Sequence, residues 1–311
     1  MLRYSLRRLA SAIPTLLLLI TVAFFLIRIA PGGPFDGEKA LPPEIAANLA
    51  AKYHLDEPLI KQYGRYVWHI LRFDLGPSFH YRDWTVNDLI AQGAPVSFTL
   101  GILALILAVL AGTAIGAWAA LRQNSPGDYT VMSIAMIGIS VPNFVMAPLL
   151  ILLFAITLGW LPAGGWELRP SRLVLPVVTL ALPMIAYIAR ITRASMIEVL
   201  HSSFIRAVRA KGLPEKEIVL RHALKPALLP VISYLGPAAA AILTGSVVIE
   251  KIFTIPGIGS YFVQGALNRD YTLVMGVVIL YGVLILVFNF LVDLLYAWLD
   301  PRIRYDDMVT R

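Results

Sequence analysis

The sequence predicts an all-α membrane protein, and three observations lead to that fold class. Its mean hydropathy is +0.75, and only 14% of its 311 residues are charged, which places it outside the range of soluble domains. Six mainly apolar runs are each long enough to cross the roughly 30 Å hydrocarbon core of a bilayer as a helix. The chain contains no cysteine, which excludes disulfides and cysteine-based zinc sites.

The first apolar run, residues 9–29, predicts the first transmembrane helix, preceded by a short N-terminal segment, residues 1–8. Arg3, Arg7 and Arg8 are typical of the start of a signal peptide, but the run is too long for the apolar part of one. It ends in FLIRIAPGGP, where Arg28 occupies the place that a small residue would need for cleavage. We therefore interpret the run as an uncleaved span.

Residues 30–97 form the one sizeable segment outside the predicted spans, and they are too few for an independent enzyme domain. LPPEIAANLAAKYHL has prolines at its start and predicts a short helix. IKQYGRYVWHILRF predicts a second helix with four side chains on one face (Ile60, Tyr63, Val67 and Leu71). DLGPSF predicts a turn, and TVNDLIAQ predicts a short helix capped by its threonine. The segment either packs over the outer ends of the spans or contacts something delivered from outside.

Five further runs complete one transmembrane domain of about residues 95–300. They are residues 98–121, 130–158, 173–196, 227–249 and 273–298. Gly112 and Gly116 have the GxxxG spacing that permits close contact between helices. Prolines predict bends in the third and fourth spans (Pro142, Pro148, Pro176 and Pro183). Bent helices serve either a moving pathway or the fixed packing of irregular helices.

Basic residues predict the orientation, because the cytoplasmic flanks of membrane spans collect Lys and Arg. They occur in the N-terminal segment, at Arg122, in the region 190–225 and in the C-terminal tail, residues 299–311. With six spans all four positions fall on one side, so both termini and the 197–226 loop are predicted to be cytoplasmic. Residues 250–272 then form a periplasmic loop. This orientation explains most of the net charge of +7 and weakens any inference of nucleic-acid binding.

The sequence lacks the motifs that would give the chain chemistry of its own. It has no GxxxxGK[ST] loop to hold ATP, no HExxH zinc motif and no GxSxG nucleophile motif. Ion-coupled carriers place titratable groups near the middle of the bilayer, whereas Asp293 and Glu250 lie close to the ends of their predicted spans. We predict a transport subunit rather than an enzyme, with no catalytic residue, cofactor or metal. An ion-coupled secondary carrier and a membrane scaffold or sensor are the alternatives.

The stretch RAVRAKGLPEKEIVLRHALKP, residues 206–226, is the most informative part of the chain. Apolar side chains at helical spacing predict a buried stripe (Ile197, Leu200, Phe204 and Val208). Gly212 suits the left-handed residue after a helix, and Pro214 suits the first turn of the next helix. Glu215 and Glu217 follow where the helix dipole favours acids. We expect a helix, a tight turn and a second helix.

Four explanations were weighed for the cations of this stretch: nucleic acid, a lipid surface, a topology signal alone, and a cytoplasmic protein partner. A nucleic-acid site needs aromatic stacking platforms or a longer basic face, which the stretch lacks. A helix on a lipid surface rarely includes a capped turn with complementary acids. A topology signal explains the cations but not the apolar stripe. Docking to a cytoplasmic protein explains cations, stripe and turn, and no nucleic-acid partner is predicted.

These residues resemble the cytoplasmic EAA-type loop of permease subunits from binding-protein-dependent ABC importers. In that family the loop reads E-A-A-x-x-x-G, and its short helix fits a groove on the ATPase. Arg206 stands here at the first position, and Arg and Val at the first and third positions resemble the peptide importers of the peptide/nickel family, where ARAKGLP is usual. The ATPase-docking loop that the resemblance implies consists of Arg206, Ala207, Val208, Arg209, Ala210, Lys211, Gly212, Leu213, Pro214 and Glu215.

Three other stretches resemble the same family. LRRLASAIPTLLLLITVAFFLIRIAPGGPF resembles its first span and R-x-x-P-G-x-P exit, and FDLGPSF resembles its outer G-D-L-G-x-S motif, with Phe73 in place of glycine. VIEKIFTIPGIGSYFVQGALNRDY resembles its E-x-x-F-x-x-P-G-x-G segment. There we predict an outer gate that either contacts peptide or is a packed connection (Glu250, Phe253, Pro256, Gly257, Gly259 and Asp270).

The likeness extends from Leu2 to Tyr305 and is greatest to the oligopeptide branch of the family. It implies the fold of type I ABC importer permeases in a bacterial inner membrane, and import of oligopeptides by alternating access. The implied complex contains a homologous second permease subunit, two ATPase subunits that hold ATP and magnesium, and an extracytoplasmic peptide-binding protein. Peptide substrate and membrane lipid are the other implied partners of this chain. Import of dipeptides, glutathione or nickel is the alternative within the family.

Overall fold

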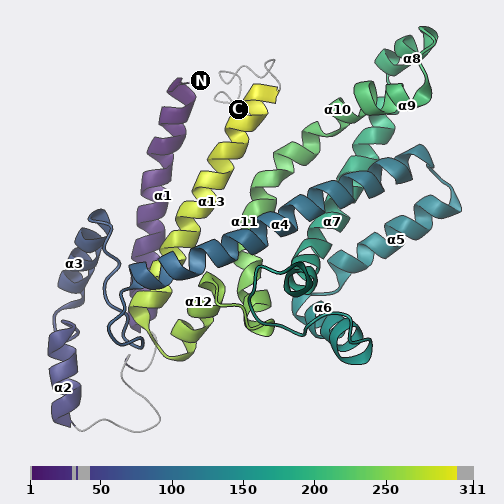
Figure 1. Cartoon of the computed structure of the whole chain (residues 1–311). Coiled ribbons are helices and arrows are strands. Elements are labelled where there is room, and N and C mark those ends of the chain that lie inside the picture. The colour runs from purple at the N-terminus through teal and green to yellow at the C-terminus, as the bar shows by residue number, and fades with distance from the viewer. Residues whose placement is uncertain (1, 30–32, 34–42, 300–311) are drawn as a thin grey trace. The chain divides into compact units, whose positions relative to one another are not determined.

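The computed structural model describes residues 2–29, 33 and 43–299, and it is helical throughout, as predicted (Figure 1). Within those ranges the pairing of extended segments is limited to one isolated β-bridge, between Pro77 and Thr85. Five helices are long and apolar enough to cross a membrane: α1 (Leu2–Ile29), α4 (Val86–Leu121), α7 (Pro170–Leu200), α11 (Leu229–Ile252) and α13 (Tyr271–Leu299). The predicted all-α membrane fold is therefore confirmed.

The third predicted span is a pair of helices rather than one rod. Helix α5 (Pro126–Ser140) is followed by α6 (Asn143–Leu150), which continues into the π-helix η1 (Ile151–Thr157). The helix axis bends by 108° between α5 and the segment formed by α6 and η1. Pro142 has no N–H to continue α5, and its carbonyl instead accepts from Val145 N (2.9 Å) and Met146 N (3.0 Å) to start α6. A bend therefore occurs at Pro142, and counting the pair as one span gives six.

The described chain divides into two compact units, and the first contains residues 98–255 together with the end of α13 from Ile285. Helix α7 lies at its centre and packs against α5, α6 and α11. Glycines allow α4 to approach α7 closely: a Cβ on Gly112 would lie 2.8 Å from the Cβ of Ile188, and one on Gly116 would lie 2.7 Å from the Cβ of Thr192. The GxxxG pair thus serves packing within the chain.

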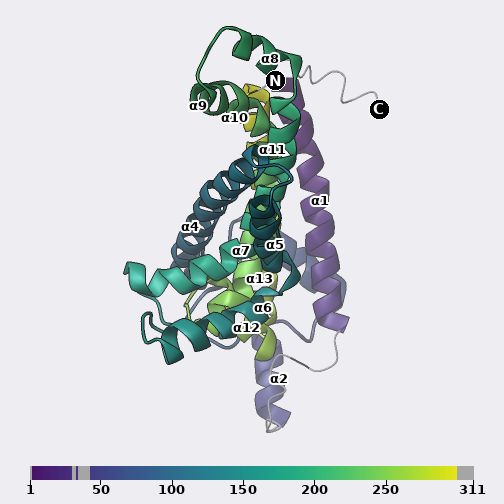
Figure 2. The same cartoon turned by 90° about the vertical axis from the view of Figure 1, so that its right-hand side faces the viewer.

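Short helices follow the C-terminal end of α7. They are α8 (Ser203–Ala210), α9 (Glu215–Glu217), the π-helix η2 (Ile218–Ala223) and α10 (Leu224–Ala227), which leads into α11. Two perpendicular views place α8 and α9 beyond one end of α7 and α6 at the other end (Figures 1 and 2). The 203–217 turn and helix α6 therefore lie at opposite ends of the central helix.

The second unit contains residues 2–97 and 256–284. It comprises α1, α2 (Pro43–Lys52), α3 (Leu59–Leu71), the start of α4, α12 (Ile258–Leu267) and the start of α13. Its core is apolar (Val86, Leu89, Ile258, Leu273 and Val277). The short helix expected after Thr85 is the beginning of the long α4, because the apolar pattern continues without a break. Thr85 does cap it, since Asp88 N donates to Thr85 Oγ1 (3.2 Å).

The apolar face of α3 is not the side that the structure buries. Ile60 and Leu71 are exposed, by 70% and 68%, whereas the buried residue of the helix is Gln62. Tyr63 is half-buried and its hydroxyl lies 2.7 Å from Thr21 Oγ1 on α1. Apolar spacing misplaced this helix because its inward side carries polar groups that form hydrogen bonds.

Parts of two predictions fall outside the described residues. Residues 30–32 and 34–42 include most of the predicted exit from the first span and the start of the outer segment. Residues 300–311 include nearly all of the predicted C-terminal tail.

Candidate functional site

The predicted docking loop folds as a capped helix and a left-handed turn. Ser202 is the N-cap of α8, where its Oγ accepts from Ile205 N (3.3 Å). The helix ends at Ala210, and Gly212 follows with φ +78°, its N–H donating to Arg209 O (2.9 Å). An L-residue adopts this backbone conformation only with strain, so the glycine has a conformational reason to be there.

The second helix starts directly after the turn. Pro214 is its cap rather than a residue of its first turn, with its carbonyl accepting from Glu217 N (2.9 Å) and Ile218 N (3.1 Å). Arg209 on α8 closes the turn by an ion pair from its Nη2 to Glu215 Oε1 (2.5 Å). The hydrogen bond from Arg209 holds the pKa of the Glu215 carboxyl below its usual value.

One face of the loop is anchored in the first unit. Ile205 and Val208 pack in a buried cluster with residues from α7, η2 and α10 (Met196, Leu200, Ile218, Val219, Ala223 and Ala227). Ile197 packs against this cluster too. Phe204 does not: its side chain is 52% exposed, so its assignment to the buried stripe is wrong. The helix breaks at His201 and Ser202, which restarts the periodicity and places Ile205 inward instead.

The opposite face is open to solvent, and we call it the α8 surface. Val208 is buried and Leu213 is half-buried, but the other eight residues of the predicted docking loop are exposed (Arg206, Ala207, Arg209, Ala210, Lys211, Gly212, Pro214 and Glu215). Phe204 and Leu220 belong to the same loop region and expose large apolar side chains, by 52% and 54%. The sequence contained a signal for Phe204, because Ser202 is a good helix cap and marks a new helix.

A buried ion pair holds the neighbouring 122–129 loop. Arg193 on α7 donates from Nε to Asp128 Oδ1 (2.7 Å) and from Nη2 to Asp128 Oδ2 (2.6 Å), and the Asp128 side chain is only 1% exposed. Asp128 also accepts from Asn124 N (2.9 Å). A cavity of about 420 Å³ separates this loop from the Arg209–Glu215 turn. Spacing in the sequence gave no sign of the ion pair, because its partners are 65 residues apart.

Two residues of the predicted outer gate, Glu250 and Phe253, lie in the first unit and are fully buried. The carbonyl of Phe253 accepts from Gly165 N (2.7 Å), and a Cβ on Gly164 would lie 2.6 Å from it. The left-handed residue of the turn after α11 is Thr254, with φ +55°. Gly257 has φ −100° in an extended conformation that any residue adopts, so its backbone does not require glycine.

The other four gate residues lie in the second unit. Pro256 is exposed, while Gly257 and Gly259 are buried at the start of α12. Asp270 is fully buried and caps α13 by accepting from Leu273 N (3.1 Å). It also accepts from His80 N (3.1 Å) and from the Ser78 hydroxyl. The buried members of the gate stabilise backbone turns, which supports the alternative of a packed connection.

No group of three or more His, Asp or Glu side chains that could hold a metal ion occurs in the described ranges. What the described site offers is an exposed cationic and apolar loop, fixed from behind by a buried cluster.

Comparison with known proteins gives the same family as the sequence motifs indicate. Residues 112–305 match the family model of the binding-protein-dependent transport system inner membrane component, and residues 1–100 match the model of the N-terminal part of such components. The chain is 59% identical to the oligopeptide transport system permease protein OppB of Salmonella typhimurium, over 98% of this chain and 100% of that protein. It is 48% identical to the dipeptide transport system permease protein DppB of Bacillus subtilis, over 98% of each chain.

Solved structures with a similar fold include an inward-facing form of the MetNI methionine ABC transporter. One chain of it superposes with a TM-score of 0.59 at 19% identity, over 68% of this chain and 96% of that chain. A likeness at this identity indicates a common fold, that of ABC importer permeases.

Proposed function

The chain belongs to the family of inner membrane components of binding-protein-dependent transport systems, and from this we propose that it is the permease subunit of an ABC importer for oligopeptides. The relative that is 59% identical over its whole length is an oligopeptide permease, which favours that substrate class. The dipeptide permease at 48% identity keeps dipeptides as the second candidate. Glutathione and nickel stay alternatives from sequence resemblance alone.

The α8 surface is the proposed contact with an ATPase subunit. The observation that carries this role is its two-sidedness: Ile205 and Val208 fix the helix to the core, while cations and Phe204 face solvent. A docking helix needs both properties, because a force on the exposed face has to reach the membrane helices behind it. Arg209, Gly212 and Glu215 hold the turn that presents this face.

The proposed complex contains this chain, a homologous second permease subunit, two ATPase subunits with ATP and magnesium, and an extracytoplasmic peptide-binding protein. The α8 surface and both termini face the cytoplasm, as the distribution of basic residues predicts. Peptide passes by alternating access. An ATPase can drive this change only if the α8 surface binds it with different free energies in the two states.

The first test is purification of the tagged chain from native membranes, followed by reconstitution of whatever subunits remain bound. We expect uptake of labelled tri- to pentapeptides that requires ATP and the binding protein. Unlabelled competitors from dipeptide to hexapeptide then separate the two substrate candidates. Uptake by this chain alone, driven by an ion gradient, would instead establish a secondary carrier.

The docking contact is tested separately by crosslinking. The natural chain has no cysteine, so Ala207→Cys on the α8 surface introduces a single thiol. We expect this variant to crosslink to an ATPase subunit and to react with impermeant thiol reagents only from the cytoplasmic side. Lys251→Cys, an exposed position at the other end of α11, is the matched control and should do neither. Equal crosslinking at both positions contradicts the docking role.

A further inference from the structure

A cavity of about 310 Å³ lies in the second unit, between the end of α1, helix α3, the 74–79 turn and the start of α13. Its size is within the range of about 300–1,000 Å³ that is usual for small-molecule sites. The transport mechanism proposed above does not use it. Its walls combine aromatic rings with basic side chains, and several buried polar atoms among them have no hydrogen-bond partner.

Three of these atoms are donors: Arg28 Nε, Arg65 Nη1 and the Tyr66 hydroxyl. Burial raises the pKa of the Tyr66 phenol, so it stays protonated and remains a donor at neutral pH. Buried polar groups in folded proteins are almost always paired, and unpaired ones call for an explanation such as a ligand or ordered water. Three unpaired donors on one cavity favour a ligand rich in acceptors.

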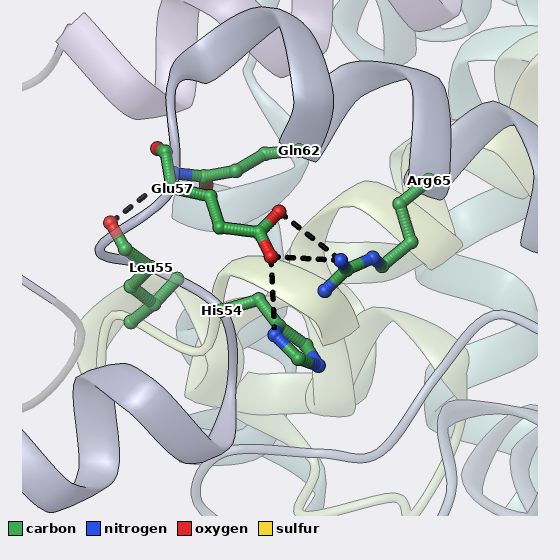
Figure 3. Close-up of polar contacts among 5 residues, drawn as sticks. All are labelled: His54, Leu55, Glu57, Gln62 and Arg65. Carbon is green, nitrogen blue, oxygen red and sulfur yellow. Dashed lines mark hydrogen bonds and ion pairs between the residues drawn. The ribbon is translucent and has the colours of Figure 1, made fainter.

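The local contacts of α3 explain why one guanidinium nitrogen of Arg65 has no hydrogen-bond partner (Figure 3). Its Nη2 is held by both oxygens of Glu57, at 2.9 and 3.1 Å, and Glu57 also lies 3.5 Å from His54 Nδ1. Nη1 makes no such contact. Glu57 thus orients the guanidinium and leaves one of its edges available.

Gln62 is oriented just as firmly. Its Nε2 donates to Leu55 O (3.1 Å) and to Glu57 O (2.7 Å), which fixes the amide and leaves Oε1 as a buried acceptor without a partner. A ligand that satisfies this side of the cavity therefore carries a hydrogen-bond donor as well as an acceptor group.

Aromatic rings hold Arg28 in place. Its Cζ lies 5.4 Å from the ring of Phe24 and 5.5 Å from the ring of Tyr271. The ring of Tyr66 is 5.8 Å from that of Phe24, so both donors lie beside the same fully buried phenylalanine. Stacking positions the guanidinium without using its hydrogen bonds.

The charge of the lining favours an anion. Lys52 adds a third cation to the two arginines, and the one carboxylate of the lining, Asp74, is already engaged. It pairs with His69 Nδ1 (2.8 Å) and accepts from Gly76 N (2.9 Å), and these hydrogen bonds, that from Gly76 first, hold the pKa of Asp74 below its usual value. The positive charge of the arginines is therefore only partly balanced, by Glu57.

The cavity lies at the end of a membrane-crossing helix. Leu26 and Ile29, in the last turn of α1, expose apolar side chains by 64% and 73%, which suits contact with lipid. Arg28 in the same turn faces the cavity. At the end of a membrane span, where the lipid headgroups begin, the abundant anion is the phosphate of a phospholipid headgroup.

We propose that the cavity binds a phosphate ester whose alcohol carries an amine or hydroxyl group. Arg28, Arg65 and Tyr66 donate to the phosphate oxygens, and Gln62 Oε1 accepts from the alcohol part. Ethanolamine and glycerol headgroups of phospholipids have this chemistry, and so do their soluble phosphate esters.

The test uses the purified, delipidated full chain in maltoside detergent. Dioleoyl phosphatidylethanolamine and soluble phosphoethanolamine are titrated separately, with thermal stability and native mass spectrometry as readouts. Variants Arg65→Gln and Tyr66→Phe should weaken binding of the ligand at least tenfold. Arg72→Gln is the matched control, because Arg72 is exposed at the C-cap of the same helix, stacks on Trp68 at 4.5 Å and does not line the cavity.

The outcomes separate the two sources. Binding of the lipid but not of phosphoethanolamine identifies a headgroup site, and equal binding of phosphoethanolamine identifies a site for soluble phosphate esters. The proposal fails if neither ligand binds the natural chain, or if Tyr66→Phe binds as tightly as Arg72→Gln. Tyr66→Phe removes only a hydroxyl that has no partner, so it decides the matter even if Arg65→Gln does not fold.

Discussion

Replacement of Gly212 tests the docking role most directly, because at this position the strain of the backbone can be distinguished from clashes of an added side chain. The residue has φ +78°, and a Cβ built on it would meet nothing within 4 Å. Any side chain therefore fits in this chain, and the cost of a substitution comes from the backbone alone. Placing an L-residue in the left-handed region costs about 1–2 kcal/mol, with asparagine better tolerated than most residues and β-branched residues least tolerated.

These costs give an ordered series of variants. A cost of 1.4 kcal/mol is a tenfold change in an equilibrium constant, so Gly212→Ala at about 1 kcal/mol should reduce the equilibrium constant for forming the intact turn roughly fivefold. Gly212→Val, at about 2 kcal/mol, should reduce it roughly thirtyfold. Gly212→Asn should stay close to the natural chain. The predicted order of peptide uptake is Gly, Asn, Ala and Val.

The assay is ATP-dependent peptide uptake by the reconstituted complex, measured beside ATP hydrolysis and membrane insertion. We expect Gly212→Val to insert normally and to uncouple hydrolysis from uptake. If it imports peptide normally, the turn has no role in coupling. If Gly212→Asn is worse than Gly212→Ala, the groove of the partner excludes side chains by size, and the backbone explanation is wrong.

Three further predictions concern the supports of the site. Asp128→Ala should destabilise the chain by about 1–3 kcal/mol, because the Arg193 guanidinium loses its carboxylate partner while its side chain stays 26% exposed to solvent. The double variant with Arg193→Ala should regain part of the loss of thermal stability in detergent, and no regain would mean that the pair is not coupled. Phe204→Ala should weaken capture of the ATPase subunits while leaving the melting temperature unchanged, since the side chain is 52% exposed. Ile205 is fully buried, so Ile205→Ala is the contrasting control and should lower the free energy of unfolding by about 2–5 kcal/mol. Asp270→Ala should leave the buried Ser78 hydroxyl and Leu273 N without their acceptor, at about 1–3 kcal/mol each, and speed proteolysis of the second unit. Unchanged cleavage would argue against the cap.

Local signals predicted much of this fold. Long apolar runs marked the membrane helices, Pro142 marked the bend and Gly212 marked the left-handed turn, since each depends on neighbours in sequence. The break between α7 and α8 was also a local event, signalled by Ser202, but an unbroken apolar period outweighed it. For this reason Phe204 was assigned to the buried side of the helix, whereas it is exposed.

Contacts between distant residues lay beyond the reach of sequence patterns. The Asp128–Arg193 pair joins residues 65 apart, and the hydrogen bond from His80 to Asp270 joins residues 190 apart. Periodicity also failed on α3, where the buried side carries Gln62 and the apolar Ile60 faces out. In the first two cases a polar group is buried because a distant partner satisfies it, and one sequence does not contain that pairing. Gln62 instead donates to the carbonyls of Leu55 and Glu57, which are close in sequence.

Helix α7 shows how the docking loop is mechanically connected. It is continuous over 31 residues, and at about 1.5 Å per residue it extends beyond the roughly 30 Å thickness of a bilayer core at one end or both. One end lies next to α8, and residues near the other form the cluster in which Arg172 donates to Gly164 O (2.9 Å), beside the carbonyl of Phe253. Only His201 and Ser202 separate this rod from α8. Under the proposed docking role, a displacement of the α8 surface would reach the far side of the first unit through this single helix, and the Asp128–Arg193 pair would couple the neighbouring loop to it.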